Sequence, residues 1–206
     1  MGKLIVTEFM TLDGVAQAPG APDEDRESGF THGGWQAPLL DEESSEVMFE
    51  QAKSMDALLL GRRTYDIFAN YWPNAPEEIP FTGLLNRVPK YVASRTLTEP
   101  LPWQGTAVVA GDFAESITTL KARHDEVHVI GSLNLVQSLL RFGLVDRLNL
   151  WMYPLLLGSG KQVFADGTVP TALRSTESVT YPNGTVHIAY EIAGVPTYGD
   201  MTVEGG

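Results

Sequence analysis

The residues best suited to chemistry stand at short turns, and the first such turn contains Gly131 and Ser132. A β-branched segment, residues 127–130, precedes it, and apolar residues at helical spacing follow from Leu133 onward, so Ser132 is a plausible N-cap. The first N–H groups of a helix have no intrahelical partner and attract anions. The turn therefore predicts a phosphate site. The alternative is that a small residue is present there only for packing.

Two further turns carry guanidinium groups. Arg62 and Arg63 follow Gly61 at the end of one predicted strand, and Ser94 and Arg95 follow the next predicted strand. Arginine can bind a phosphate through paired hydrogen bonds. In a parallel sheet, ligands bind outside the carboxyl ends of the strands. Three such turns at one edge favour a nucleotide site, although both arginines of the second turn could instead be solvated helix residues.

Several other chemistries lack their motifs. The sequence contains no GxGxxG, no GxxxxGK[ST] and no GxSxG pattern, and it has no cysteine. His124 and His128 are spaced like a zinc pair, but their segment passes from a helix into a strand, so we expect no metal site. The glycine-rich segment 158–161, which includes Lys161, reads as a plain turn.

Composition limits the partners. The chain has 206 residues and a formal net charge of −12, with 43% hydrophobic residues. Nucleic acid and anionic membranes both select clustered Lys and Arg, so neither is expected as a partner. No segment is long and apolar enough to span a membrane, and no signal segment is evident. We expect a cytoplasmic protein, most simply a homodimer, that acts on a small molecule.

The elements that must position these turns alternate along the chain. Strands are predicted at residues 3–10, 56–60, 87–93, 106–110, 127–130 and 146–157, and helices at 44–53, 61–72, 114–124 and 133–142. Asn183-Gly184 between two alternating segments predicts a C-terminal hairpin. This order indicates one α/β domain over residues 1–206, built on a mainly parallel sheet with an antiparallel edge.

Residues 17–44 form a segment that is long for a loop in one domain. It is rich in Gly, Pro and acidic residues and contains Phe30 and Trp35. Aromatic rings on a polar loop suggest a lid that folds over a ligand or over a subunit interface. From residue 194 to 206 the chain is expected to be frayed.

Four segments together resemble the dihydrofolate reductase-like superfamily. They are residues 11–14 (TLDG), 56–65 (DALLLGRRTY), 129–132 (VIGS) and 144–161, which runs from LVDRL to LGSGK. The likeness is greatest to the reductase domain of riboflavin-biosynthesis deaminase-reductases and its stand-alone bacterial relatives, whose loop glycines and aromatic residues also look similar. It implies a three-layer α/β/α fold around a mixed sheet of about eight strands.

The resemblance implies NADPH as cofactor. The three turns would meet its diphosphate, its 2′-phosphate and the adenine side, and Ser132 stands where the family has a second glycine. The residues that the resemblance assigns to the cofactor are Gly61, Arg62, Arg63, Thr64, Ser94, Arg95, Gly111, Ile130, Gly131, Ser132 and Leu133.

The implied chemistry is hydride transfer to a pyrimidine or pterin, with the protein supplying orientation and water exclusion. On the substrate side we expect Asp13, Phe30 and Trp35, and Asp13 and Glu46 are the candidate catalytic acids. Asp13 could instead merely begin the turn at Gly14, and Glu46 could be a solvated helix residue. The competing hypothesis is a non-catalytic nucleotide-binding or dimerisation module with an apolar interface around Trp35 and Trp151.

Overall fold

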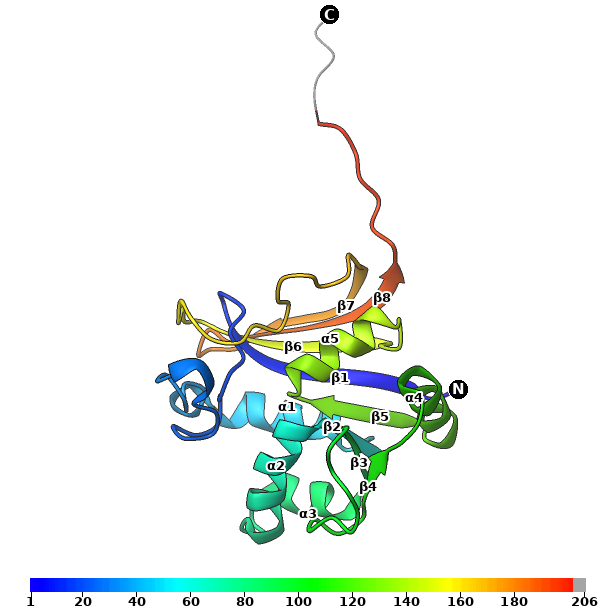
Figure 1. The fold of residues 1–206 in the computed structure, drawn as a ribbon. Helices are drawn as coiled ribbons and strands as arrows, with labels where there is room; N and C mark the ends of the chain where they lie inside the picture. The colour runs from blue at the N-terminus through cyan, green and yellow to red at the C-terminus, as the bar shows by residue number, and fades with distance from the viewer. Residues whose placement is uncertain (202–206) are drawn as a thin grey trace, which may run out of the picture.

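A single eight-stranded sheet organises the protein in the computed structural model, which describes residues 1–201 (Figure 1). The strand order is β4-β3-β2-β5-β1-β6-β8-β7. The strands are β1 (Lys3–Thr11), β2 (Ala57–Gly61), β3 (Lys90–Ala93), β4 (Thr106–Val109), β5 (Glu126–Ile130), β6 (Arg147–Tyr153), β7 (Ala172–Thr180) and β8 (Val186–Gly194).

The sheet is mixed, as the sequence predicts. The six strands from β4 to β6 pair in parallel, whereas β8 pairs antiparallel with both β6 and β7. The hairpin turn at Asn183-Gly184 is confirmed: Gly184 has φ +84° and its N–H donates to the carbonyl of Tyr181 at 2.9 Å. Glycine adopts this positive φ without steric cost.

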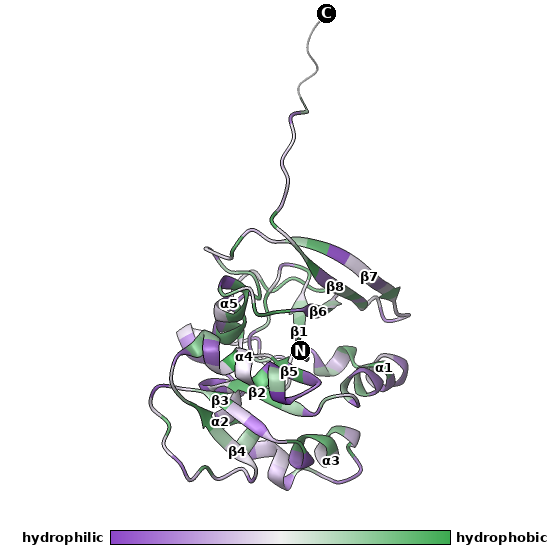
Figure 2. Cartoon of the chain, turned by 90° about the vertical axis from the view of Figure 1, so that its right-hand side faces the viewer, coloured by the Kyte–Doolittle hydropathy of each residue, from purple (hydrophilic) through white to green (hydrophobic). Residues whose placement is uncertain are grey.

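Helices cover both faces of the sheet. They are α1 (Glu42–Ala52), α2 (Arg62–Tyr71), α3 (Pro80–Arg87), α4 (Phe113–Arg123) and α5 (Leu133–Arg141), with short 3-10 helices at Glu27–Gly29, Ala37–Leu39 and Trp72–Asn74. Apolar residues of α4 and α5 form one core with Val6 and Leu59. Residues of α1, α2 and α3 pack with Leu58 and Leu60 on the opposite face. Figure 2 shows the apolar character of the inner strands.

Successive residues of β2 serve opposite cores because strand side chains alternate between faces. Leu58 and Leu60 face one core and Ala57 and Leu59 the other, and all four are fully buried. The unbroken apolar run of this strand is typical of a central parallel strand covered on both sides.

Several predicted boundaries were wrong. Helix α1 begins at Glu42, because Asp41 is its N-cap and accepts from the Ser44 N–H at 2.9 Å. The segment predicted as one long strand ends at Tyr153, before the turn at Pro154. Helix α3 was missed; it ends at Arg87, where a strand was predicted to begin, and β3 begins only at Lys90.

The loop of residues 17–44 packs onto the sheet face beside α1. Phe30 and Trp35 lie in a third apolar cluster with Tyr153, Trp151 and Tyr181. Their rings therefore cover the protein's own core.

At the other end of the chain, residues 195–201 have no regular structure and run away from the body (Figure 1). The rest of the tail predicted to fray, residues 202–206, lies outside the described residues. Within residues 1–201, every helix is too short or too polar to cross a bilayer.

Candidate active site

One large cavity opens at the carboxyl ends of the parallel strands, with a volume of about 1800 Å³. All eleven residues that the family resemblance assigned to the cofactor line it: Gly61, Arg62, Arg63, Thr64, Ser94, Arg95, Gly111, Ile130, Gly131, Ser132 and Leu133. The strand order explains this, because β4, β3, β2, β5 and β1 are successive neighbours that all run in the same direction. The turns after these strands therefore meet at one edge.

Ser132 joins two of the turns. Its hydroxyl accepts a hydrogen bond from the Gly61 N–H at 3.0 Å instead of capping its own helix. Its backbone is left-handed, with φ +69°, which is costly for a residue other than glycine. A Cβ on Gly131 would touch Thr64 at 3.7 Å. The start of α5 thus packs directly against the start of α2.

The turn after β3, which contains Ser94 and Arg95, supplies polar groups beside Arg62. The guanidinium of Arg62 binds Asp66 at 2.7 Å and donates to the Thr96 hydroxyl at 3.2 Å. The hydroxyl of Ser94 accepts from the N–H groups of Thr96 and Leu97. Arg95 is exposed and forms no ion pair within residues 1–201. Its charge remains open to an anion in the cavity.

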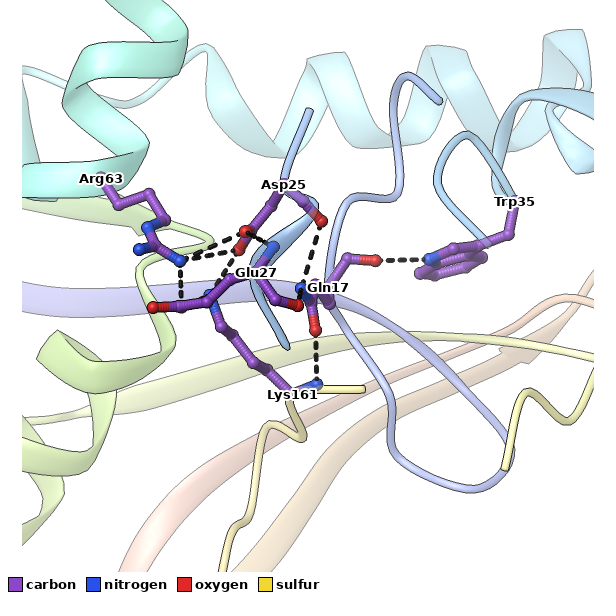
Figure 3. Close-up of polar contacts among 6 residues, drawn as sticks. All are labelled: Gln17, Asp25, Glu27, Trp35, Arg63 and Lys161. Carbon is purple, nitrogen blue, oxygen red and sulfur yellow. Dashed lines mark hydrogen bonds and ion pairs between the residues drawn. The ribbon is translucent and has the colours of Figure 1, made fainter. Parts of the chain in front are cut away.

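Two cations at the cavity are held by the loop of residues 17–44 (Figure 3). Asp25 binds Arg63 at 3.2 Å and Lys161 at 2.5 Å, and Glu27 also pairs with both. Gln17 braces the cluster by donating to the carbonyls of Asp25 and Glu27, both at 3.1 Å.

These contacts favour the ionised carboxylates. Hydrogen bonds from Arg63 and then Lys161 lower the pKa of Glu27 to about 2. Burial opposes ionisation of Asp25, but its contacts with Lys161 and Arg63 lower its pKa overall. The segment containing Lys161 was predicted as a plain turn. Its backbone is irregular as expected, but Lys161 itself is one of the residues that line the cavity.

Asp13 does not line the cavity. Its carboxylate accepts from the N–H groups of Leu157 and Gly158, at 3.1 and 2.7 Å, and from the Thr11 hydroxyl. The Thr11 hydrogen bond is the main cause of its lowered pKa, ahead of the two backbone donors. Asp13 therefore ties the end of β1 to the segment after β6, a structural role beyond the predicted alternative that it merely begins the turn at Gly14.

The other residues expected on the substrate side also lie elsewhere. Glu46 is exposed on α1, and neither Phe30 nor Trp35 lines the cavity. The Trp35 indole donates to the Gln17 carbonyl at 2.9 Å, and Trp151 is fully buried. The apolar interface around Trp35 and Trp151 is therefore contradicted, because both rings belong to the core of this chain.

Sequence reasoning missed two buried polar residues at the cavity. Glu8 on β1 is 1% exposed, and burial raises its pKa from 4.5 to about 8. Gln36 donates to the Tyr153 hydroxyl at 2.6 Å. A lone glutamate in an apolar strand, KLIVTEFMT, was the signal that could have identified Glu8.

The donors suit a phosphorylated dinucleotide. The first residues of helix α5, Leu133 and Asn134, line the cavity, and Arg62, Arg63 and Arg95 add positive charge beside this helix N-terminus. A pocket for one small molecule usually measures roughly 300–1,000 Å³. A cavity of about 1800 Å³ can therefore hold a dinucleotide and a second molecule. The residues present fit a nicotinamide dinucleotide.

Known proteins resemble this chain in sequence or in fold. The chain is 29% identical over 141 residues to the uncharacterized protein YyaP of Bacillus subtilis strain 168. The aligned region covers 66% of this chain and 73% of YyaP. A protein from Shewanella sp. PV-4 assigned to riboflavin biosynthesis superposes with a TM-score of 0.69 at 21% identity, over 92% of this chain and 98% of that one.

A pyrimidine reductase-like protein from Corynebacterium diphtheriae has a TM-score of 0.63 at 15% identity, over 93% of this chain and 92% of its own. The model of the RibD C-terminal domain family matches residues 2–187. This span takes in every strand that borders the cavity and every turn that lines it. With its dihydrofolate reductase-like fold, the chain belongs to the RibD C-terminal domain family.

Proposed function

We propose that this protein is an NADPH-dependent reductase of a small heterocyclic substrate of the pyrimidine or pterin type. The main support is that three turns with backbone N–H, hydroxyl or guanidinium groups, distant in sequence, line one cavity. Membership in the RibD C-terminal domain family and the likeness to a pyrimidine reductase-like protein agree with this chemistry. A bound nicotinamide supplies the hydride.

The protein's residues have separable tasks in this proposal. The N–H groups at the start of α5 and the guanidinium of Arg62 bind the diphosphate. Ser94 and Arg95, just after β3, bind the cofactor at its adenosine 2′-phosphate. The apolar side chains of Ile130 and Leu135 line the cavity and limit water. Lys161 and Arg63 anchor the loop of residues 17–44 beside the site.

Cofactor binding tests the proposal directly. A ligand that binds only the folded state at about 100 times its Kd adds about 2.7 kcal/mol of stability. We expect NADPH to raise the melting temperature and its fluorescence to change with saturation. No stabilisation at millimolar NADPH would contradict the proposal.

A pair of variants tests the site. Arg62→Ala should weaken NADPH binding about tenfold or more, because an arginine–phosphate contact is a charge-assisted hydrogen bond worth roughly 1.5–3 kcal/mol. Arg174→Ala is the control, since Arg174 lies on the distant edge strand β7 and pairs with Glu191 on β8. Equal affinities for the two variants would place the cofactor elsewhere. Tight binding without turnover of any pyrimidine or pterin would favour the non-catalytic alternative.

A further inference from the structure

Glu8 occupies an unusual position for a carboxyl group. It lies on β1, near the centre of the sheet, and is one of the residues that line the cavity, although it is only 1% exposed. Strand β5 ends at Ile130, opposite Thr7. Glu8 therefore stands at the level where β5 gives way to the Gly131–Ser132 turn, beside the expected dinucleotide site.

The carboxyl of Glu8 lacks a structural partner. Its Oε1 atom is buried and has no hydrogen bond within residues 1–201, and no Lys, Arg or His of that range pairs with it. A buried polar atom left unpaired costs roughly 1–3 kcal/mol. Within the described residues, three other buried side-chain atoms also lack a hydrogen bond, on Trp151, Thr185 and His187, but none of these residues lines the cavity. Glu8 is therefore the one residue of these four that borders the cavity.

The chemistry of the Glu8 carboxyl limits the kind of ligand that it can bind. Burial is the one cause of its raised pKa, which is about 8, so the carboxyl keeps its proton at neutral pH. A neutral carboxyl presents an O–H donor and a C=O acceptor side by side. The edge of a cyclic amide, –NH–C(=O)–, presents the matching acceptor and donor in one plane. Uracil and pterin rings both have such an edge, whereas a cationic amine would require the ionised form.

We infer that Glu8 is a substrate-binding residue whose neutral carboxyl pairs with the cyclic amide edge of the heterocycle to be reduced. This inference rests on the proposed function for the identity of the reaction. The pairing itself depends only on the cavity, the burial of Glu8 and its unpaired oxygen.

A matched pair of probes tests the inference in the full chain. 5,6-Diaminouracil offers ring N–H groups, and 5,6-diamino-1,3-dimethyluracil has the same ring with those groups methylated. By calorimetry in the presence of NADP⁺, we expect the wild type to bind the first at least tenfold more tightly than the second. Glu8→Gln keeps a donor and an acceptor and should retain this preference. Glu8→Leu removes both and should abolish it.

NADPH fluorescence titration of each protein separates the two claims. Wild-type protein that fails to bind NADPH would contradict the proposed function, while a Glu8-dependent preference for diaminouracil would still support this inference. Equal binding of both probes by the wild type, or no binding of diaminouracil, would overturn the inference. An unchanged preference in Glu8→Leu would overturn it too. Should Glu8→Leu not fold, Glu8→Gln with the two probes still decides, because loss of the preference there contradicts the pairing.

Discussion

At the scale of single residues, burial separates the two acids that matter most. Asp13 stands in a family-like motif, but three hydrogen-bond donors, from Thr11, Leu157 and Gly158, occupy its carboxylate at a turn. Glu8 stands in an ordinary apolar strand, but the fold removes it from water beside the cavity. Asp13 became a candidate site residue because it belongs to a motif, whereas Glu8 is a candidate because of its physical environment.

Glu8 should make stability depend on pH. Below about pH 4.5 it is protonated in both the folded and the unfolded chain. Between 4.5 and about 8 the unfolded chain loses this proton and the folded chain keeps it, so stability falls by up to about 1.4 kcal/mol per pH unit. Glu8→Gln cannot ionise. The free energy of unfolding of Glu8→Gln, relative to that of the wild type, should therefore rise by a few kcal/mol between about pH 5 and pH 8. Urea denaturation at several pH values is the measurement. A constant difference would contradict the burial of a neutral Glu8.

At the scale of elements, two variants of Ser132 test how the start of α2 is joined to the start of α5. Ser132→Ala keeps the costly left-handed φ of +69° and loses the hydrogen bond to the Gly61 N–H. Ser132→Gly loses the same bond but relieves the backbone. We expect the alanine variant to be the less stable of the two by about 1 kcal/mol. Urea denaturation of both is the measurement, and a more stable alanine variant would show that the backbone here is not left-handed.

The loop of residues 17–44 depends on Asp25, which contacts Arg63 and Lys161 and has a side chain only 12% exposed. Asp25→Asn should lower the free energy of unfolding by about 1–2 kcal/mol, because it removes charge-assisted bonds, and should speed proteolysis within the loop. Asp23→Asn is the control: its ion pair with Arg26 is largely exposed, and such pairs contribute less than about 1 kcal/mol. Equal effects of the two variants would show that the cluster does not hold the loop.

At the scale of the whole molecule, one sheet separates two large cores. Leu58, Leu59 and Leu60 contribute to both through alternate faces. We therefore predict one cooperative unfolding transition, with far-UV and near-UV circular dichroism giving the same midpoint in urea. Two separated midpoints would contradict a single domain. A homodimer remains a prediction, and its interface must exclude Trp35 and Trp151, which are buried within the chain.

The sequence by itself determined the local features. Apolar periodicity located nearly every strand and helix, and Asn183-Gly184 located the hairpin, because these signals depend on neighbouring residues. Helix α3 escaped notice. Its segment begins with Pro80 and contains Gly83, and the helix is stabilised largely by burial of Leu84 and Leu85 against distant elements.

Only the tertiary structure decided which of these features form the site. The strand order brings Arg62, Ser94 and Gly131 to one cavity, and the pairing of strands distant in sequence is not encoded in any local pattern. The same packing encloses Glu8 and leaves Glu46 in water. A carboxyl group's ionisation depends on what surrounds it in space, so its role could be assigned only after the fold had placed it.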